Sequence, residues 1–142
     1  MPESKRLKRF LVLAIGTAGT ASLLGAQTGT RSVWQGVYTA AQSERGRSVY
    51  QQSCGQCHGE TLGGDIGPTL TGPFWSIWEG RSAADLYKSI RTTMPADAPE
   101  SLKAQEYADL IAFLFSVNKF PAGETELPAD PVALEAIRIS KQ

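Results

Sequence analysis

The stretch Cys54-Gly55-Gln56-Cys57-His58 constrains this chain more than any other part of its sequence. Two thiols three positions apart, with a histidine directly after the second, are typical of a c-type haem attachment site. Each thiol can form a thioether to the porphyrin edge, and this tether then holds the imidazole of His58 under the iron as its proximal ligand. We therefore expect the chain to fold around one haem c, bound covalently through Cys54 and Cys57.

Three other interpretations of the motif compete with haem attachment. A structural zinc site needs about four ligands, but the whole chain has two cysteines and one histidine. A thioredoxin-like dithiol is expected within a βαβ pattern, which the surrounding sequence lacks. A structural disulfide between Cys54 and Cys57 leaves His58 unexplained, whereas haem attachment accounts for all three residues.

Charge is distributed unevenly along the 142 residues, and this excludes one class of partner. Lys5, Arg6, Lys8 and Arg9 are four of the 14 basic residues, and Glu3 is the single acidic residue near them. From position 27 onward, ten basic residues face thirteen acidic ones. Nucleic-acid binding needs clustered Lys and Arg to neutralise phosphates, so we expect no nucleic-acid partner.

The first 26 residues have the layout of a secretory signal peptide. A basic start is followed by an apolar run over residues 10–24 and by the small residues Gly25 and Ala26. Because this run is short and contains Gly16 and Gly19, it is a weak candidate for a membrane span. We expect cleavage after Ala26 and export to the periplasm, and membrane attachment only if the segment stays uncleaved.

Apolar spacing and capping residues predict a first and a last main helix. Thr39 is expected to cap the first helix, with Gln42 reaching back in a capping box, and the helix extends to about Gln52. The last main helix covers about 104–117, and its buried stripe is formed by Tyr107, Leu110, Ile111, Leu114 and Val117.

Another main helix is predicted between these two. Ser82 is its expected N-cap, Asp85 lies in its first turn, and the residues before Pro95 end it. A helical turn is also expected at 73–78, and a short final helix after Asp130-Pro131. The fold class is therefore all-α.

The second iron ligand follows by elimination. His58 is the single histidine, which excludes two histidine ligands from one chain, and leaves Met, Lys, Tyr, water or no ligand. Met1 is expected to leave with the signal peptide, so Met94 remains as the methionine candidate, in the context Thr93-Met94-Pro95. A lone methionine is more often a core residue, but the haem motif favours ligation here. Met94 would favour the ferrous state relative to a second nitrogen ligand.

With these residues identified, the chain resembles the class I cytochromes c over roughly residues 39–118. Gly46 and Tyr50 fall in that family's first helix, and Gly67-Pro68-Thr69-Leu70 is similar to its proximal loop. The resemblance implies three main helices around one covalent haem. It also implies that Pro68 accepts a hydrogen bond from His58 Nδ1, that Leu70 contacts the haem, and that Phe113 crosses the first helix at Gly46.

The extensions at 27–38 and 119–142 depart from the core pattern of that family. We expect the first to lie as a strap over the fold. Together they resemble small bacterial cytochromes associated with pyrroloquinoline-quinone dehydrogenases. Trp78, Tyr87 and Arg91 are the candidates for holding the haem propionates.

A six-coordinate iron has no open position for a substrate, so we expect an electron carrier and no enzyme activity. The chain would pass single electrons between a donor, such as a quinoprotein dehydrogenase, and the respiratory chain. The alternative is a haem enzyme with an open distal site that acts on peroxide, nitric oxide or sulfur compounds. A fixed subunit of a larger oxidoreductase would share the carrier's chemistry but have a permanent partner.

Overall fold

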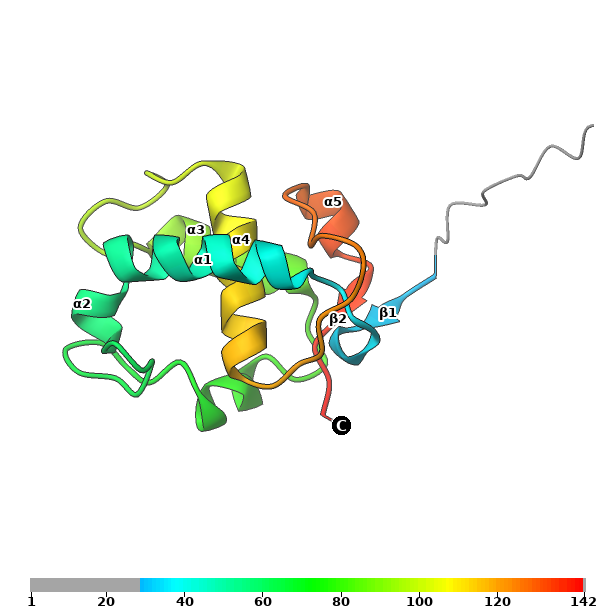
Figure 1. Ribbon diagram of the computed structural model, residues 1–142, viewed down its shortest axis with the longest axis horizontal. Helices are drawn as coiled ribbons and strands as arrows, with labels where there is room; N and C mark the ends of the chain where they lie inside the picture. The colour runs from blue at the N-terminus through cyan, green and yellow to red at the C-terminus, as the bar shows by residue number, and fades with distance from the viewer. Residues whose placement is uncertain (1–28, 142) are drawn as a thin grey trace, which may run out of the picture.

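The computed structural model describes residues 29–141 and shows a mostly helical protein (Figure 1). The segment expected to be a signal peptide lies outside these residues. Five α-helices, two 3₁₀ helices and a two-stranded sheet form the described part, in the order β1 (Arg31–Ser32), η1 (Val33–Gln35), α1 (Ala40–Ser53), α2 (Gly55–His58), η2 (Gly72–Ile77), α3 (Ala83–Thr93), α4 (Ala104–Val117), α5 (Pro131–Leu134) and β2 (Ile137–Arg138). The expected all-α class is confirmed, with the small sheet as an addition that the sequence did not predict.

Helix α1 begins as expected, but one side chain has another role. The Thr39 hydroxyl accepts the backbone N–H of Gln42 at 3.1 Å, which satisfies one of the free donors of the first turn. The expected return contact from Gln42 to Thr39 is wrong. Gln42 is fully buried, and its amide instead bonds both backbone groups of Leu127, at 2.9 Å and 2.7 Å. Burial without these two contacts would leave the amide unsatisfied.

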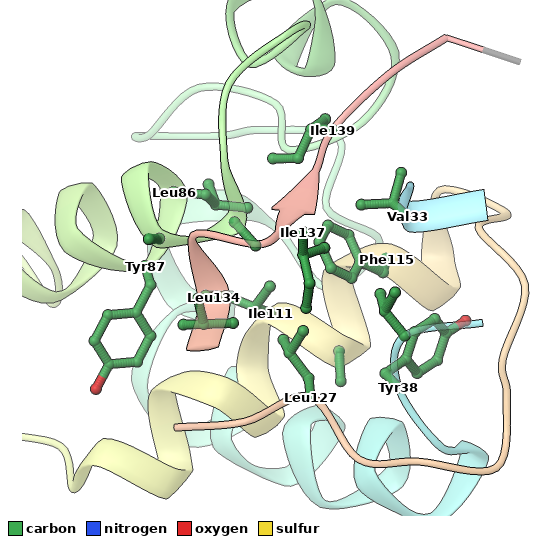
Figure 2. Close-up of a cluster of buried hydrophobic side chains, with 14 of the residues drawn as sticks. Val33, Tyr38, Leu86, Tyr87, Ile111, Phe115, Leu127, Leu134, Ile137 and Ile139 are labelled. Atoms are coloured by element: carbon green, nitrogen blue, oxygen red, sulfur yellow. The ribbon is translucent and has the colours of Figure 1, made fainter. Parts of the chain in front are cut away.

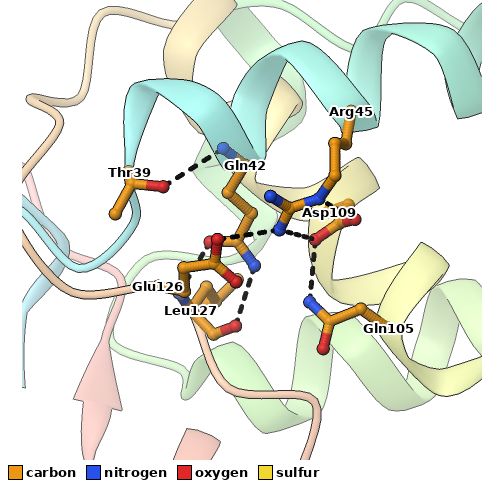
Figure 3. A network of polar contacts seen from close by, with 7 residues as sticks. All are labelled: Thr39, Gln42, Arg45, Gln105, Asp109, Glu126 and Leu127. Carbon is orange, nitrogen blue, oxygen red and sulfur yellow. Dashed lines mark hydrogen bonds and ion pairs between the residues drawn. The ribbon is translucent and has the colours of Figure 1, made fainter.

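Helices α1 and α4 cross closely, and glycine makes this possible. A Cβ on Gly46 would overlap the carbonyl oxygen of Asp109 and lie 2.9 Å from Cβ of Phe113. Beside the crossing, Arg45 forms a bidentate ion pair with Asp109, at 2.9 Å and 3.1 Å (Figure 3). The crossing therefore joins the helix that leads into the CxxCH motif to the central helix of the fold.

The boundaries of α3 and α4 follow from their capping groups. Ser82 and Asp85 form a reciprocal capping box at the start of α3. The helix ends at Thr93, with Met94 as its C-cap and Pro95 next. Helix α4 begins after Lys103, whose backbone N–H is bonded by the Glu106 carboxylate at 2.7 Å. Both helices start with an acidic side chain in the first turn, which the helix dipole favours.

Two groups of buried apolar residues form the core. The first, which we call the clasp cluster, joins α3 and α4 to the two extensions (Figure 2). Its members from the extensions include Val33, Leu127, Leu134, Ile137 and Ile139, all at most 5% exposed. The second, the cavity cluster, contains Tyr50, Leu62, Leu110, Phe113 and Leu114. The extensions thus supply much of the core and are more than a strap over it.

The two extensions also bond to each other. β1 and β2 pair in parallel, with Arg31 opposite Ile137. Trp34 Nε1 donates to the carbonyl of Ser140 at 2.7 Å, and the Tyr38 hydroxyl donates to the carbonyl of Phe120 at 2.6 Å. The two extensions are therefore joined to each other, and their strands lie next to α5 in Figure 1. Within residues 29–141, no helix is both long and apolar enough to span a bilayer.

Candidate functional site

A cavity of about 770 Å³ brings the predicted site residues together. Its walls include Cys54, Cys57, His58, Pro68, Leu70 and Met94, which come from α2, the following loop and the end of α3. This volume lies within the range of about 300–1,000 Å³ that is usual for small-molecule and cofactor sites. Residues separated by up to 40 positions in the sequence thus face one space.

The imidazole of His58 is fixed on one side. His58 is 7% exposed, and its Nδ1 lies 2.8 Å from the carbonyl oxygen of Pro68. Since a carbonyl only accepts, Nδ1 carries the proton and donates, which leaves the Nε2 lone pair available as a metal ligand. Such an outer hydrogen bond orients a ligating histidine and raises its basicity.

Glycine allows the loop after α2 to approach this ring. A Cβ on Gly67 would lie 2.9 Å from Cε1 of His58, and the Gly67 N–H donates to the carbonyl of Cys57 at 2.7 Å. Two side chains from the helices hold the same loop. The Tyr50 hydroxyl donates to the Gly59 carbonyl at 2.6 Å, and Asn118 Nδ2 donates to the Leu70 carbonyl at 3.1 Å. The proximal loop is therefore bonded to α1, α2 and the end of α4.

The two thiols have different surroundings. Cys54 is half-buried, and burial, with a smaller contribution from Cys57, raises the pKa of its thiol to about 11. Cys57 is exposed, and neither thiol is in a disulfide. In the described part of the chain, no group of three or more His, Cys, Asp or Glu side chains is arranged to hold a metal ion. The zinc alternative therefore has no ligand set within residues 29–141.

Met94 lies where α3 ends. Its backbone N–H donates to the Ile90 carbonyl at 2.8 Å, and the peptide bond to Pro95 is cis. Its carbonyl accepts from the Tyr107 hydroxyl of α4 at 3.0 Å. Both backbone groups of Met94 are thus bonded, one by α3 and one by α4.

The chemistry of the cavity walls fits a haem. Leu70, Ile90, Leu110 and Leu114 supply apolar wall, as a flat, mostly apolar ring requires. Trp78 also lines the cavity and is 5% exposed, and among residues 29–141 its indole N–H has no hydrogen-bond partner. A buried donor without an acceptor is costly, and a haem carboxylate is an acceptor of suitable chemistry. The walls therefore offer apolar contact, a free imidazole nitrogen, a thioether and a free N–H donor.

Two of the three candidates for the propionates do not line the cavity. Arg91 forms an exposed ion pair with Glu100 at 3.4 Å, and Tyr87 packs edge-on against Tyr107. No Lys or Arg is found among the cavity-lining residues of the described chain, and Asp97 is their one carboxylate. Sequence reasoning gave no role to Asn118 and placed Tyr107 only in a buried stripe. Hydrogen bonds from side chains to distant backbone carbonyls leave no periodic pattern that could reveal them.

Comparison with known proteins identifies relatives of the region that forms the cavity. The sequence profile of the family described as cytochrome C oxidase, cbb3-type, subunit III matches residues 41–114. A protein described as "Cytochrome c-553-like" from Synechocystis sp. is 32% identical over 73 residues, which are 51% of this chain and 66% of that protein. The chain thus spans slightly less than two thirds of this curated relative's length. No solved structure is significantly similar to the chain.

Proposed function

Because the chain belongs to the cytochrome c family described as cytochrome C oxidase, cbb3-type, subunit III, we propose that it shuttles single electrons between redox proteins outside the cytoplasm, with His58 and Met94 as the axial ligands of its haem. Family membership, with one CxxCH motif in the sequence, shows a c-type cytochrome domain with one haem c attached through Cys54 and Cys57. The transport of electrons, the ligands of the iron, the location and the partners are the proposal.

One observation carries the ligation: His58 and Met94 line the same apolar cavity. Bound haem supplies an iron that alternates between the ferrous and ferric states. The Pro68 carbonyl orients the imidazole of His58, and the end of α3 brings the Met94 thioether to the same space. The nitrogen of His58 and the sulfur of Met94 would together hold the iron, so the chain would offer a substrate no open position on it.

Optical spectroscopy of the purified holoprotein tests the ligation. In the ferric state it should show the weak far-red absorption of a methionine–iron bond, and Met94→Ala should abolish this band. Thr92→Ala is the matched control, because Thr92 is exposed, lies two residues away and does not line the cavity. A wild-type protein without the band, with a high-spin spectrum and ready binding of added ligands, would instead support a haem enzyme with an open distal site.

The basic and apolar layout of residues 1–26 supports export, since haem is attached to such proteins outside the cytoplasm. Mass spectrometry of protein isolated from the periplasmic fraction should find a mature N-terminus at Gln27. Holoprotein that stays with the membrane fraction and keeps residues 1–26 would show an uncleaved anchor instead.

A quinoprotein dehydrogenase is the proposed donor, on the resemblance of the extensions at 27–38 and 119–142. Stopped-flow mixing of a reduced pyrroloquinoline-quinone dehydrogenase with the ferric protein should give rapid reduction that saturates with dehydrogenase concentration. If the dehydrogenase reduces the ferric protein no faster than free reduced pyrroloquinoline quinone does, the dehydrogenase is not its electron donor. Co-purification in fixed stoichiometry with an oxidoreductase would identify a permanent subunit.

A further inference from the structure

Tyr107 is the side chain that ties Met94 to the central helix. It lies in the first turn of α4 and is 0% exposed. Its hydroxyl donates to the backbone carbonyl of Met94 across 3.0 Å. Tyr107 is absent from the cavity walls, whereas Met94 is part of them. Tyr107 does not face the cavity itself, and its hydroxyl is joined to the cavity wall through the backbone of Met94.

This hydrogen bond holds a stretch of backbone that the helical hydrogen bonds of α3 and α4 do not hold. The Met94 N–H makes the last hydrogen bond of the continuous helical series of α3, and Pro95, which follows, has no N–H to continue the helix. Beyond this point, the Glu100 N–H returns to the Arg91 carbonyl at 3.0 Å. Among the described residues, the Tyr107 hydroxyl therefore supplies the side-chain hydrogen bond from α4 to the backbone between the N–H groups of Met94 and Glu100.

Tyr107 is well placed to act as a rigid support. Its ring packs edge-on against Tyr87 of α3, with centroids 6.0 Å apart. Two positions further along α4, Asp109 is joined to Arg45 of α1. Since a buried tyrosine has only two side-chain torsions and Tyr87 packs against its ring, the hydroxyl is held relative to α3, while the Arg45–Asp109 pair holds α4 itself relative to α1.

We propose that Tyr107 is a positioning residue that keeps the Met94 thioether on the iron in the ferric state. This inference rests on the proposed ligation by Met94. A thioether is a soft ligand and binds ferric iron less firmly than ferrous iron, so the ferric protein depends more on how the chain holds the sulfur. An added ligand must displace the sulfur, and moving Met94 away breaks its bond to Tyr107.

Imidazole binding to the ferric holoprotein at neutral pH tests this role. Tyr107→Phe removes only the hydroxyl, and we expect its imidazole affinity to rise about five- to tenfold, the factor that corresponds to one buried hydrogen bond. The matched control is Tyr38→Phe. Tyr38 is also buried and donates to a backbone carbonyl, that of Phe120 at 2.6 Å, but it does not line the cavity or contact Met94.

Both variants should lose similar stability to denaturant, but only Tyr107→Phe should bind imidazole more tightly. Equal imidazole affinity in wild type and Tyr107→Phe, or an equal rise in both variants, would overturn the inference. A wild-type ferric spectrum without the methionine band would overturn the ligation itself, so the two failures are distinguishable.

A measurement on the wild type keeps the inference testable if Tyr107→Phe does not yield holoprotein. Imidazole should increase amide hydrogen exchange in residues 96–101, because this segment leaves α4 with Met94, and should leave residues 60–71 unchanged. Unchanged exchange in 96–101 at saturating imidazole would contradict the role of Tyr107.

Discussion

Asp109 joins α4 to α1 at the point where the two helices cross. Burial acts to raise the pKa of its carboxyl, but the hydrogen bonds from Arg45 and Gln105 and the attraction of the Arg45 charge outweigh it and hold the pKa below its ordinary value. Asp109 is 4% exposed, and its backbone carbonyl faces Gly46. The same residue therefore fixes α1 through its backbone contact and through its charge (Figure 3).

The lowered pKa predicts a pH-dependent contribution to stability. A carboxyl whose pKa is lower in the folded state stabilises the fold above its unfolded pKa of about 3.9, and this contribution is lost as pH falls through the folded pKa. Asp109→Asn should lower the free energy of unfolding at pH 6 by about 1–2 kcal/mol, and the difference from wild type should shrink toward pH 3. Urea unfolding from pH 6 to pH 3 measures it.

Asp65→Asn is the control for this prediction, because it makes the same change of charge in an exposed loop. It should follow the wild type at every pH. A deficit in Asp109→Asn that stays constant down to pH 3 would show that the ionised carboxylate is not its source.

For single residues, the sequence predicted which side chains line the cavity. It did not predict which other side chains hold those residues in place. Cys54, Cys57 and His58 were found because their spacing is specific, and Met94 because few candidates remained. Tyr107 and Asn118 each bond a backbone carbonyl of a loop, 13 and 48 positions away. Such contacts depend on the folded path of the chain, and no local pattern encodes them.

The C-terminal extension is joined to α1 through side-chain contacts. Gln42 of α1 bonds both backbone groups of Leu127, and Arg45 reaches Glu126 at 2.9 Å. The extension thus contacts α1 beside its crossing with α4 (Figure 3). It also covers apolar residues of α3 and α4 that would otherwise face water (Figure 2).

Gln42→Ala tests this connection. The change leaves a buried N–H and a buried carbonyl of Leu127 without partners, so we expect a loss of about 2–3 kcal/mol in the free energy of unfolding, together with faster amide exchange at Leu127. Gln51→Ala is the control, since Gln51 is an exposed residue of the same helix. Similar losses in the two variants would mean that the loss reflects α1 itself and not its bond to the extension.

Helix positions were predictable because their causes are local. Ser82 with Asp85, and Asp130 before Pro131, mark helix starts within a few residues of sequence. The pairing of β1 with β2 was not predictable, because it joins two-residue strands more than 100 positions apart. Gln42 was assigned to a local cap for the same reason: its real partner, Leu127, lies 85 positions away.

For the whole molecule, the separation of the two clusters predicts how the fold depends on haem. Of the buried members of the clasp cluster only Trp78 lines the cavity, whereas Tyr50, Leu110 and Leu114 of the cavity cluster all border the space that the haem is proposed to fill. The double variant Cys54→Ser, Cys57→Ser prevents covalent attachment. The amide protection that this haem-free chain retains should be concentrated in α4 and the clasp cluster, while residues 59–71 and 95–103 exchange as in an unfolded chain.

Hydrogen exchange with mass spectrometry, with the holoprotein as reference, measures this pattern. Equal loss of protection in α4 and in the two loops would show that the clasp cluster has no stability without the cofactor. Higher protection in the loops than in α4 would contradict the proposed place of the haem.

The place of the β1–β2 pair in the fold decides where an added tether or domain would be attached to the folded body. Residues 31 and 137 are paired, and in Figure 1 both strands lie on the far side of α4 from α2. A lipid tether or a fused domain added before β1 would therefore be attached on the opposite side of α4 from α2. An anchor at that point would hold the folded body by the end that lies away from His58.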